Sequence, residues 1–262
     1  MNSICSRDNP FFKELVKLSG SSRQRNKSAQ TLLDGVHLLA AYLDAGMMPQ
    51  HALLNSAALQ NAEITALLKR LKDVSLTQLD DKLFTALSEL KTPGGILALI
   101  DLPHPEVVIA PRGFLLLLED IQDPGNLGSI LRSAAAAACD AVFLSPGCAD
   151  AWSPKVLRAA MGGHFVLRIY EQQDLLNVAK AFTGALLAAS LQASHSLYEC
   201  DLRGKIAFLV GNEGAGLSPD LLNLATQKVR IPMPGKVESL NAAAATAICL
   251  FEAVRQRNSN AH

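Results

Sequence analysis

The feature that most constrains this fold is an apolar run, FLLLLE at residues 114–119, in which five successive side chains are apolar. A strand with one face in water alternates apolar and polar side chains, and this run does not. It is therefore expected to be a central parallel strand covered on both faces. Further strands are expected at 141–145, 185–190, 206–211 and 228–231, each leading toward a helical segment. This alternation predicts an α/β domain with a doubly wound parallel sheet.

The first hundred residues show a shorter alternation of the same kind. Helical patterns are expected to alternate with short strands, the helices at 31–46, 63–72 and 81–90 and the strands at 51–54, 74–76 and 96–100. Residues 101–113 hold three prolines and no helical period, which is typical of a linker. The chain is thus expected to comprise a small α/β domain at 1–100, a linker at 101–113 and a larger α/β domain at 114–262.

Charge is distributed unevenly, although the chain has 24 basic and 24 acidic side chains. Residues 1–30 carry six basic side chains against two acidic ones, whereas residues 31–110 carry five against nine. Such a basic arm indicates a polyanionic partner. Its run SGSSRQRNKS (19–28) has no apolar periodicity that would place it on a helix. For Lys13 and Lys17 a solvated helix face is the simpler interpretation.

Several classes of protein are disfavoured by composition. The five cysteines are widely spaced and form no C-x-x-C pair, so neither a disulfide framework nor a metal site is expected. The N-terminus lacks the apolar core of a signal peptide, and no stretch of about 18 apolar residues could span a membrane. The sequence therefore predicts a cytoplasmic protein without metal.

Two loops after strands of the larger domain have the composition of binding loops. In EDIQDPGNLGSILR (119–132), turn residues precede a helix whose first turns are expected to carry Arg132, where a guanidinium can hold a phosphate or stabilise an oxyanion. In VGNEGAGLSPDLL (210–222), three glycines allow a ligand to approach the backbone closely. This loop is neither a dinucleotide fingerprint nor a P-loop. Glu213 within it disfavours a bound phosphate and favours a cationic or neutral ligand.

A third stretch, KVRIPMPGKVESLNAAAATAICLFEAV (228–254), runs from a strand through a stiff turn into a helix. Pro232 and Pro234 each fix their own φ and lack an N–H, so the free backbone groups fall on Ile231, Met233 and the residues from Gly235 onward. The alanines that open the helix allow close packing. The stretch suits a small-molecule pocket, and an ordinary strand–turn–helix connection is the alternative.

Taken together, the three loops resemble the ordered motifs of the SpoU family, a branch of the SPOUT class of RNA methyltransferases. The motifs are N-x-G-x-x-x-R at 126–132, NEGxGL at 212–217 and IPMxGxxxSLN at 231–241. The resemblance extends from about residue 114 to 257. Residues 9–39 are similar, more loosely, to the substrate-binding extension of many members, whose fold is similar to that of L30e-type ribosomal RNA-binding proteins.

The resemblance implies methyl transfer from S-adenosylmethionine to a ribose 2′-hydroxyl of rRNA or tRNA, with 23S rRNA favoured, in a homodimer. It also implies a trefoil knot that forms the cofactor pocket. The implied cofactor contacts are Leu191, Gly211, Asn212, Gly214, Ile231, Met233, Leu240 and Ala243. Arg132 would be the principal catalytic residue, with Asn126, Glu213, Ser239 and Asn241 shaping the site. The implied RNA contacts are Arg7, Arg23, Arg25 and Lys27.

Two points limit what the resemblance implies. Arginine stays protonated in proteins, so Arg132 is expected to stabilise a developing alkoxide instead of accepting the proton. Ala243 stands where members often carry a small hydroxyl residue. That departure is the support for a non-catalytic RNA-binding or ribosome-assembly protein on the same fold. The sequence also leaves open a tRNA 2′-O-methyltransferase and a base methyltransferase of the same class.

Overall fold

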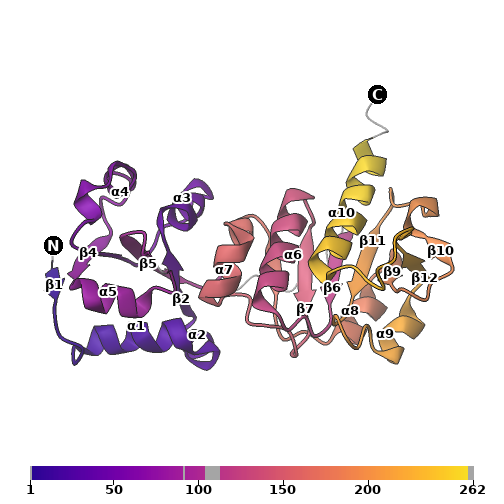
Figure 1. The fold of residues 1–262 in the computed structure, drawn as a ribbon, viewed down its shortest axis with the longest axis horizontal. Coiled ribbons are helices and arrows are strands. Elements are labelled where there is room, and N and C mark those ends of the chain that lie inside the picture. The colour runs from indigo at the N-terminus through magenta and orange to yellow at the C-terminus, as the bar shows by residue number, and fades with distance from the viewer. Residues whose placement is uncertain (1, 91, 104–112, 259–262) are drawn as a thin grey trace. The chain divides into compact units, whose positions relative to one another are not determined.

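The computed structural model of the chain describes residues 2–90, 92–103 and 113–258. The chain divides into two compact units (Figure 1). The first comprises Met1–His104 with Trp152–Phe165, and the second comprises Pro105–Ala151 with Val166–His262. Residues 152–165, which were expected in the larger domain, therefore group with the first unit. Most of the expected linker, residues 104–112, lies outside the described residues.

The first unit is built on a mixed five-stranded sheet in the order β1-β4-β3-β5-β2. Its strands are β1 (Asn2–Ile4), β2 (Gln30–Asp34), β3 (His51–Leu54), β4 (Ser75–Leu79) and β5 (Ile96–Asp101). β1, β4 and β3 run parallel, whereas β5 is antiparallel to both of its neighbours. Its helices are α1 (Pro10–Gly20), α2 (Ser22–Ser28), α3 (Val36–Asp44), α4 (Ala62–Leu68), α5 (Asp81–Leu87) and α7 (Pro154–Ala160), with 3₁₀ turns η1 (Ala58–Gln60) and η2 (Gly163–Phe165).

The single helix expected over residues 31–46 is wrong, because this stretch forms strand β2 followed by helix α3. Thr31, Leu32 and Leu33 are all buried in succession, as in a strand covered on both faces. Gly35 then reverses the chain at a φ of +99°, a value that L side chains rarely adopt. An apolar run buried on both faces has no period, so its sequence could not separate a strand from a buried helix.

The basic run 19–28 was expected to lie outside helices, and this expectation is also wrong. Ser21 caps α2 by accepting a hydrogen bond from the Gln24 amide at 3.3 Å. Arg25 is buried, with 4% of its surface exposed, and its guanidinium donates to the carbonyls of Leu18 at 2.5 Å and Ser19 at 3.2 Å. A capping serine and an inward-pointing arginine therefore replace the apolar stripe that usually marks a helix.

The second unit is built on a seven-stranded sheet in the order β10-β12-β9-β11-β6-β7-β8, and all of its strand pairs are parallel. The strands are β6 (Phe114–Leu118), β7 (Ala141–Leu144), β8 (Arg168–Tyr170), β9 (Ala185–Ala189), β10 (His195–Ser196), β11 (Ile206–Val210) and β12 (Gln227–Arg230). The parallel sheet expected from the sequence is confirmed. The sequence missed β8 and β10, which are short strands at the two edges and carry no apolar run.

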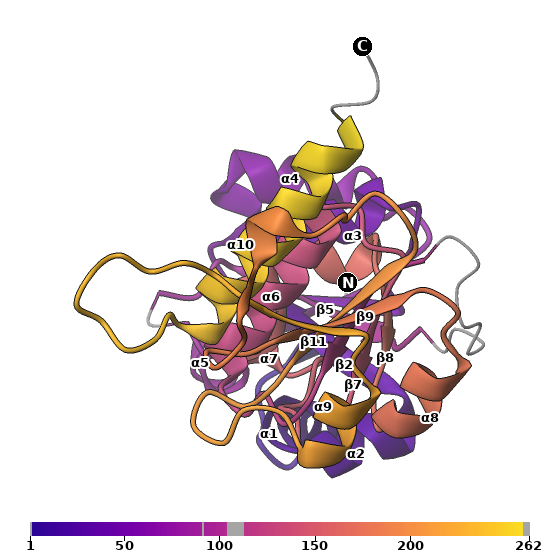
Figure 2. The same cartoon turned by 90° about the vertical axis from the view of Figure 1, so that its right-hand side faces the viewer.

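Strand β6 is an interior strand of this sheet and lies between β11 and β7, with Leu116 opposite Phe208 and Val142. All five of its side chains are at most 3% exposed. Leu115 and Leu117 pack in one core cluster with residues of α8 (Leu175–Ala181) and α9 (Pro219–Leu224). The alternating side chains point to the other face, which α6 (Pro124–Ala136) and α10 (Ala242–Asn258) cover together (Figures 1 and 2). The unit also has a 3₁₀ turn, η3 (Leu197–Glu199).

Helix α6 begins earlier than expected. The Asp123 carboxylate accepts a hydrogen bond from the Asn126 amide at 2.7 Å, and Pro124 occupies the first helical position. Arg132 therefore lies on the third turn of the helix and not on its first turns. No helix in the described ranges combines the length and apolar character needed to cross a bilayer.

Candidate active site

A cavity of about 350 Å³ lies beyond the carboxyl ends of β9, β11 and β12. Its walls are the loops at 189–192 and 210–217, the stretch 229–240, and the first turns of α10. Its volume lies within the range of small-molecule sites. The structure brings nine of the predicted residues onto its walls: Leu191, Gly211, Asn212, Glu213, Gly214, Ile231, Met233, Ser239 and Leu240. Sequence reasoning missed other lining residues, among them Gln192, Arg230, Ala242, Ala245 and Cys249.

Ala243 was predicted to contact the cofactor, but it does not line the cavity. It is 9% exposed inside α10, and its neighbours Ala242 and Ala245 form the wall instead. Its amide donates to the side-chain oxygen of Asn241 at 2.9 Å. The absence of a hydroxyl at position 243 therefore removes no group from the cavity wall, which weakens the argument for a protein that has lost its chemistry.

The glycine loop at 211–216 folds tightly back on itself. A Cβ on Gly211 would overlap the carbonyl group of Gly216, so only glycine fits there. The side-chain oxygen of Asn212 accepts hydrogen bonds from the amides of Gly214 at 2.9 Å and Ala215 at 3.0 Å. Its amide group donates to the Asp120 carbonyl at 2.9 Å, which fixes the loop to the end of β6.

The end of β6 is itself held by residues that the sequence did not identify. Asp120 has a φ of +55°, and the Ser145 hydroxyl donates to its carboxylate at 2.6 Å while accepting from its amide at 2.9 Å. The Glu119 carboxylate accepts from the Ser218 amide at 2.6 Å, at the start of α9. These contacts tie the end of β6 to the end of β7 and to the start of α9. Aspartate adopts a positive φ more often than most residues, but this tendency alone does not predict where in a sequence it happens.

The Asn bridge, a hydrogen-bonded chain of Asn241, Asn126 and Glu213, joins the three sequence motifs. The Asn241 amide group donates to the Asn126 side-chain oxygen at 2.8 Å, and the Asn126 amide group donates to the Glu213 carboxylate at 2.6 Å. The Asn241 oxygen also caps α10 by accepting from the amides of Ala243 at 2.9 Å and Ala244 at 3.2 Å. Asparagine suits this position because it donates and accepts at once.

Two residues of the stretch between β12 and α10, Met233 and Ser239, line the cavity with unused backbone groups. From Pro232 to Ser239, no peptide group is hydrogen-bonded to another residue that the structure describes. Below it, burial raises the pKa of the Cys249 thiol to about 12, so this thiol stays neutral at physiological pH. A neutral thiol is a weak nucleophile. The Cys249 thiol that lines the cavity is therefore unreactive, while Met233 and Ser239 can bind a ligand through their main-chain groups.

Arg132 lies apart from the cavity. It is exposed on α6 and, within the described ranges, forms no hydrogen bond or ion pair. It follows Asn126 by six residues, roughly 9 Å along the helix axis. The structure thus unites four of the five predicted catalytic residues at or beside the cavity mouth and leaves the fifth on an open helix face.

The predicted polyanion contacts in the first unit differ in accessibility. Arg7, Arg23 and Lys27 are exposed, whereas Arg25 is buried against backbone carbonyls. Arg23 and Lys27 are four residues apart on α2 and share one helix face. Arg25 therefore belongs to the fold of α1 and α2, and a surface contact by it is not supported. No group of three or more His, Cys, Asp or Glu side chains that could hold a metal occurs in the described part of the chain.

The sequence matches two known protein families. Residues 113–251 match the SpoU rRNA Methylase family, and residues 9–98 match the MRM3-like substrate binding domain. The chain belongs to the SpoU rRNA Methylase family. This membership confirms the resemblance carried by the three motifs. Its enzymatic class is RNA 2′-O-ribose methyltransferase.

Relatives of this SpoU methylase cover its whole length. The 23S rRNA (guanosine(2553)-2′-O)-methyltransferase RlmP of Bacillus subtilis is 31% identical over 96% of this chain and 98% of its own. An uncharacterized tRNA/rRNA methyltransferase of Synechocystis is 34% identical over 97% and 94%. A crystal structure of an RNA 2′-O ribose methyltransferase superposes with a TM-score of 0.84 at 33% identity, covering 98% of this chain and 99% of that one.

A second solved structure bears on the cofactor. The SpoU methyltransferase AviRb from Streptomyces viridochromogenes, in complex with AdoMet, superposes with a TM-score of 0.85 at 27% identity, covering 96% of this chain and 99% of that one. The parallel-sheet SPOUT architecture expected for the second unit is thereby confirmed.

Proposed function

We propose that this protein transfers a methyl group from S-adenosylmethionine to a ribose 2′-hydroxyl of 23S ribosomal RNA in the cytoplasm. The observation that carries the proposal is the Asn bridge, because it assembles the three motif loops at the mouth of one cavity. The RlmP relative, whose name specifies 23S rRNA, supports ribosomal RNA in preference to tRNA.

The cavity residues fit S-adenosylmethionine. Apolar surface for the adenine comes from Leu191, Ile231 and Leu240. The polar edge of the adenine can bind the peptide groups of Met233 and Ser239, which make no other hydrogen bond within the described residues. The Glu213 carboxylate at the rim suits a cationic sulfonium. The inert Cys249 thiol does not compete for the methyl group. When bound, the cofactor supplies an electrophilic methyl group, and the chain must hold the ribose and stabilise its oxygen.

Arg132 would stabilise the negative charge that develops on the ribose oxygen as its proton leaves. In one chain it lies outside the cavity, on an exposed helix face. We therefore propose that the enzyme is a homodimer in which Arg132 of one copy serves the cavity of the other. Asn126, Ser239 and Asn241 would position the ribose. This arrangement explains why a catalytic arginine has no partner within its own described chain.

We also propose that the C-terminal chain forms the trefoil knot that the family resemblance implies. The small side chains at the start of α10, Ala242 to Ala245, support it, because they allow the helix to pass close beneath the preceding loops. The first unit, as we propose, has an L30e-like fold and binds RNA. The match of residues 9–98 to a substrate binding domain supports the RNA-binding role.

Methyl transfer to isolated RNA tests the proposal. With labelled S-adenosylmethionine, we expect incorporation into 23S rRNA from a strain that lacks the enzyme, and digestion to nucleosides should give a 2′-O-methyl nucleoside. Label in tRNA alone would reassign the substrate, and a methylated base would make the protein a base methyltransferase. If calorimetry detects no binding of S-adenosylmethionine, the chain is a non-catalytic RNA-binding protein.

Neutralising Arg23 and Lys27 together is expected to weaken RNA binding and reduce its salt dependence. Each lost phosphate contact should lower the slope of log K against log salt by roughly 0.7–0.9, because fewer counterions are released. Binding titrations at several salt concentrations measure this slope. Lys69→Ala with Lys72→Ala removes the same charge from exposed positions of the same unit and is the control. Equal slopes for both double variants would show that α2 does not contact phosphate.

A further inference from the structure

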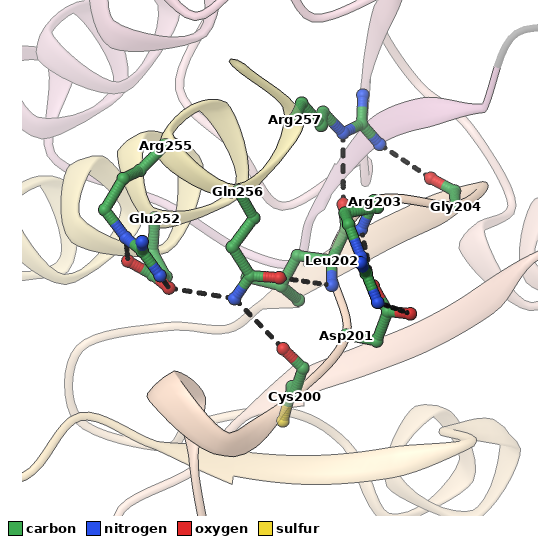
Figure 3. A network of polar contacts seen from close by, with 9 residues as sticks. All are labelled: Cys200, Asp201, Leu202, Arg203, Gly204, Glu252, Arg255, Gln256 and Arg257. Carbon is green, nitrogen blue, oxygen red and sulfur yellow. Dashed lines mark hydrogen bonds and ion pairs between the residues drawn. The ribbon is translucent and has the colours of Figure 1, made fainter. Parts of the chain in front are cut away.

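We infer that Gln256 and Arg257, at the far end of α10, are positioning residues for the cofactor cavity. They grip the loop at residues 200–204, and we call this set of contacts the C-terminal clamp (Figure 3). Neither residue lines the cavity or belongs to the three motifs. The inference rests on the proposed binding of S-adenosylmethionine, and it concerns how the chain keeps that cavity in shape.

The Gln256 side chain uses both of its polar atoms in the clamp. Its oxygen accepts a hydrogen bond from the Leu202 amide at 2.9 Å. Its amide group donates to the Cys200 carbonyl at 3.0 Å and to the Glu252 carboxylate at 2.8 Å. Figure 3 shows this carboxamide between the helix and the loop. A residue with only a donor or only an acceptor could not make all three contacts.

Arg257 holds the same loop one residue further along. Its guanidinium donates to the carbonyls of Leu202 at 3.1 Å and Gly204 at 2.8 Å, and it lies 4.2 Å from the ring centroid of Phe114. Phe114 is the first residue of β6, and its amide donates to the Asp140 carboxylate at 2.8 Å. The clamp therefore connects the end of α10 to a fully buried strand of the unit.

The clamp and the cavity wall lie on the same side of α10. The wall residues Ala242, Ala245 and Cys249 are spaced by three and four positions, and Gln256 follows Cys249 by seven. These spacings place all four side chains on one helix face. The helix is continuous from Ala242 to Asn258, so release of its far end would let the whole face, including the wall, shift.

The gripped loop is also connected to a second part of the cavity wall. Residues 190–192 line the cavity, and the chain passes from them through β10 and η3 into the loop at 200–204. β10 pairs with β12, whose end carries Arg230 and Val229 into the cavity. The clamp thus links two parts of the cavity wall that would hold the proposed cofactor. Small displacements of such walls have large effects on binding.

The test is calorimetric titration of the full-length protein with S-adenosylmethionine. For Gln256→Ala we expect the Kd to rise on the order of tenfold, because the two hydrogen bonds that join the helix to the loop are lost. We expect kcat at saturating cofactor to stay near the wild-type value while KM for the cofactor rises. Hydrogen exchange should show that the Leu202 amide has lost protection, which verifies that the clamp is open.

The control is Gln173→Ala, which also removes a glutamine donor to a backbone carbonyl, that of Glu171 at 2.8 Å. Gln173 follows β8, at the sheet edge away from the cavity, so the Kd should not change. If Gln256→Ala does not fold, Arg257→Lys carries the test, since lysine cannot reproduce the guanidinium's paired contacts.

A lowered melting temperature with an unchanged Kd would assign the clamp to stability alone and overturn the inference. Wild-type protein that does not bind S-adenosylmethionine would instead overturn the proposed function.

Discussion

Arg132→Ala is expected to abolish methyl transfer, with kcat reduced at least about 10²-fold, while the affinity for S-adenosylmethionine stays within about twofold of wild type. The reason is that the guanidinium stabilises the developing ribose oxyanion but does not line the cavity. It is exposed, so its removal should not affect folding. A labelled-methyl assay measures turnover and calorimetry measures cofactor binding. Turnover close to wild type would remove Arg132 from the mechanism.

Mixing two inactive variants tests whether Arg132 acts across a dimer. Subunits with Arg132→Ala keep an intact cavity, and subunits with Asn126→Ala keep Arg132 but lose the Asn bridge. If Arg132 of one copy serves the cavity of the other, mixed dimers contain one complete site and recover part of the activity. If each site is complete within one chain, the mixture stays inactive. A monomeric mass in solution scattering would contradict the dimer independently.

Gly211→Ala is expected to abolish binding of S-adenosylmethionine, with a Kd raised by about 10²-fold or more. The new methyl group would lie far inside the van der Waals distance of the Gly216 carbonyl carbon. The obstacle is backbone, so the loop at 211–216 must open and carry the cavity wall with it. A misplacement of about 1 Å in such a site is enough for a loss of this size.

Gly214→Ala in the same loop is the matched control. Its Cβ would meet only the Asn212 side-chain oxygen, at 3.5 Å, which is ordinary contact. We expect a Kd close to wild type for this variant. Equal losses for Gly211→Ala and Gly214→Ala would indicate that the loop tolerates no added bulk near the ligand. Equal retention would show that the tight reversal at Gly211 is dispensable for binding.

Where an apolar run of strand length is bounded by polar and turn residues, the sequence predicted the fold well. The unbroken apolar run of β6 identified an interior strand of a parallel sheet. The prediction failed where a buried strand leads directly into an apolar helix, as at Thr31–Asp34, and where polar contacts build the helix, as at Arg25. These local choices depend on neighbours that are distant in the sequence.

For the site, the motifs predicted which loops meet but not how they are held. The Asn bridge joins residues 115 and 87 positions apart, and the shared motifs placed all three of its members at one site. The hydrogen bonds between Asp120 and Ser145 depend on the positive φ of Asp120, which was not predicted from the sequence. The place of Arg132 on its helix was also predicted wrongly. The cap at Asp123 makes α6 begin at Pro124, which puts Arg132 on the third turn.

The segment at 152–165 limits how this protein can be recombined with its relatives. It groups with the first unit, where the Thr31 hydroxyl donates to the Trp152 carbonyl at 2.8 Å. Val156 and Leu157 of α7 are fully buried. In a chimera joined at residue 113, α7 and strand β2 would come from two different proteins, and the apolar surface of α7 would lose the partner against which it packs. Exchange of the first unit, which we propose binds RNA, therefore requires two grafts, the N-terminal segment and α7, transferred together.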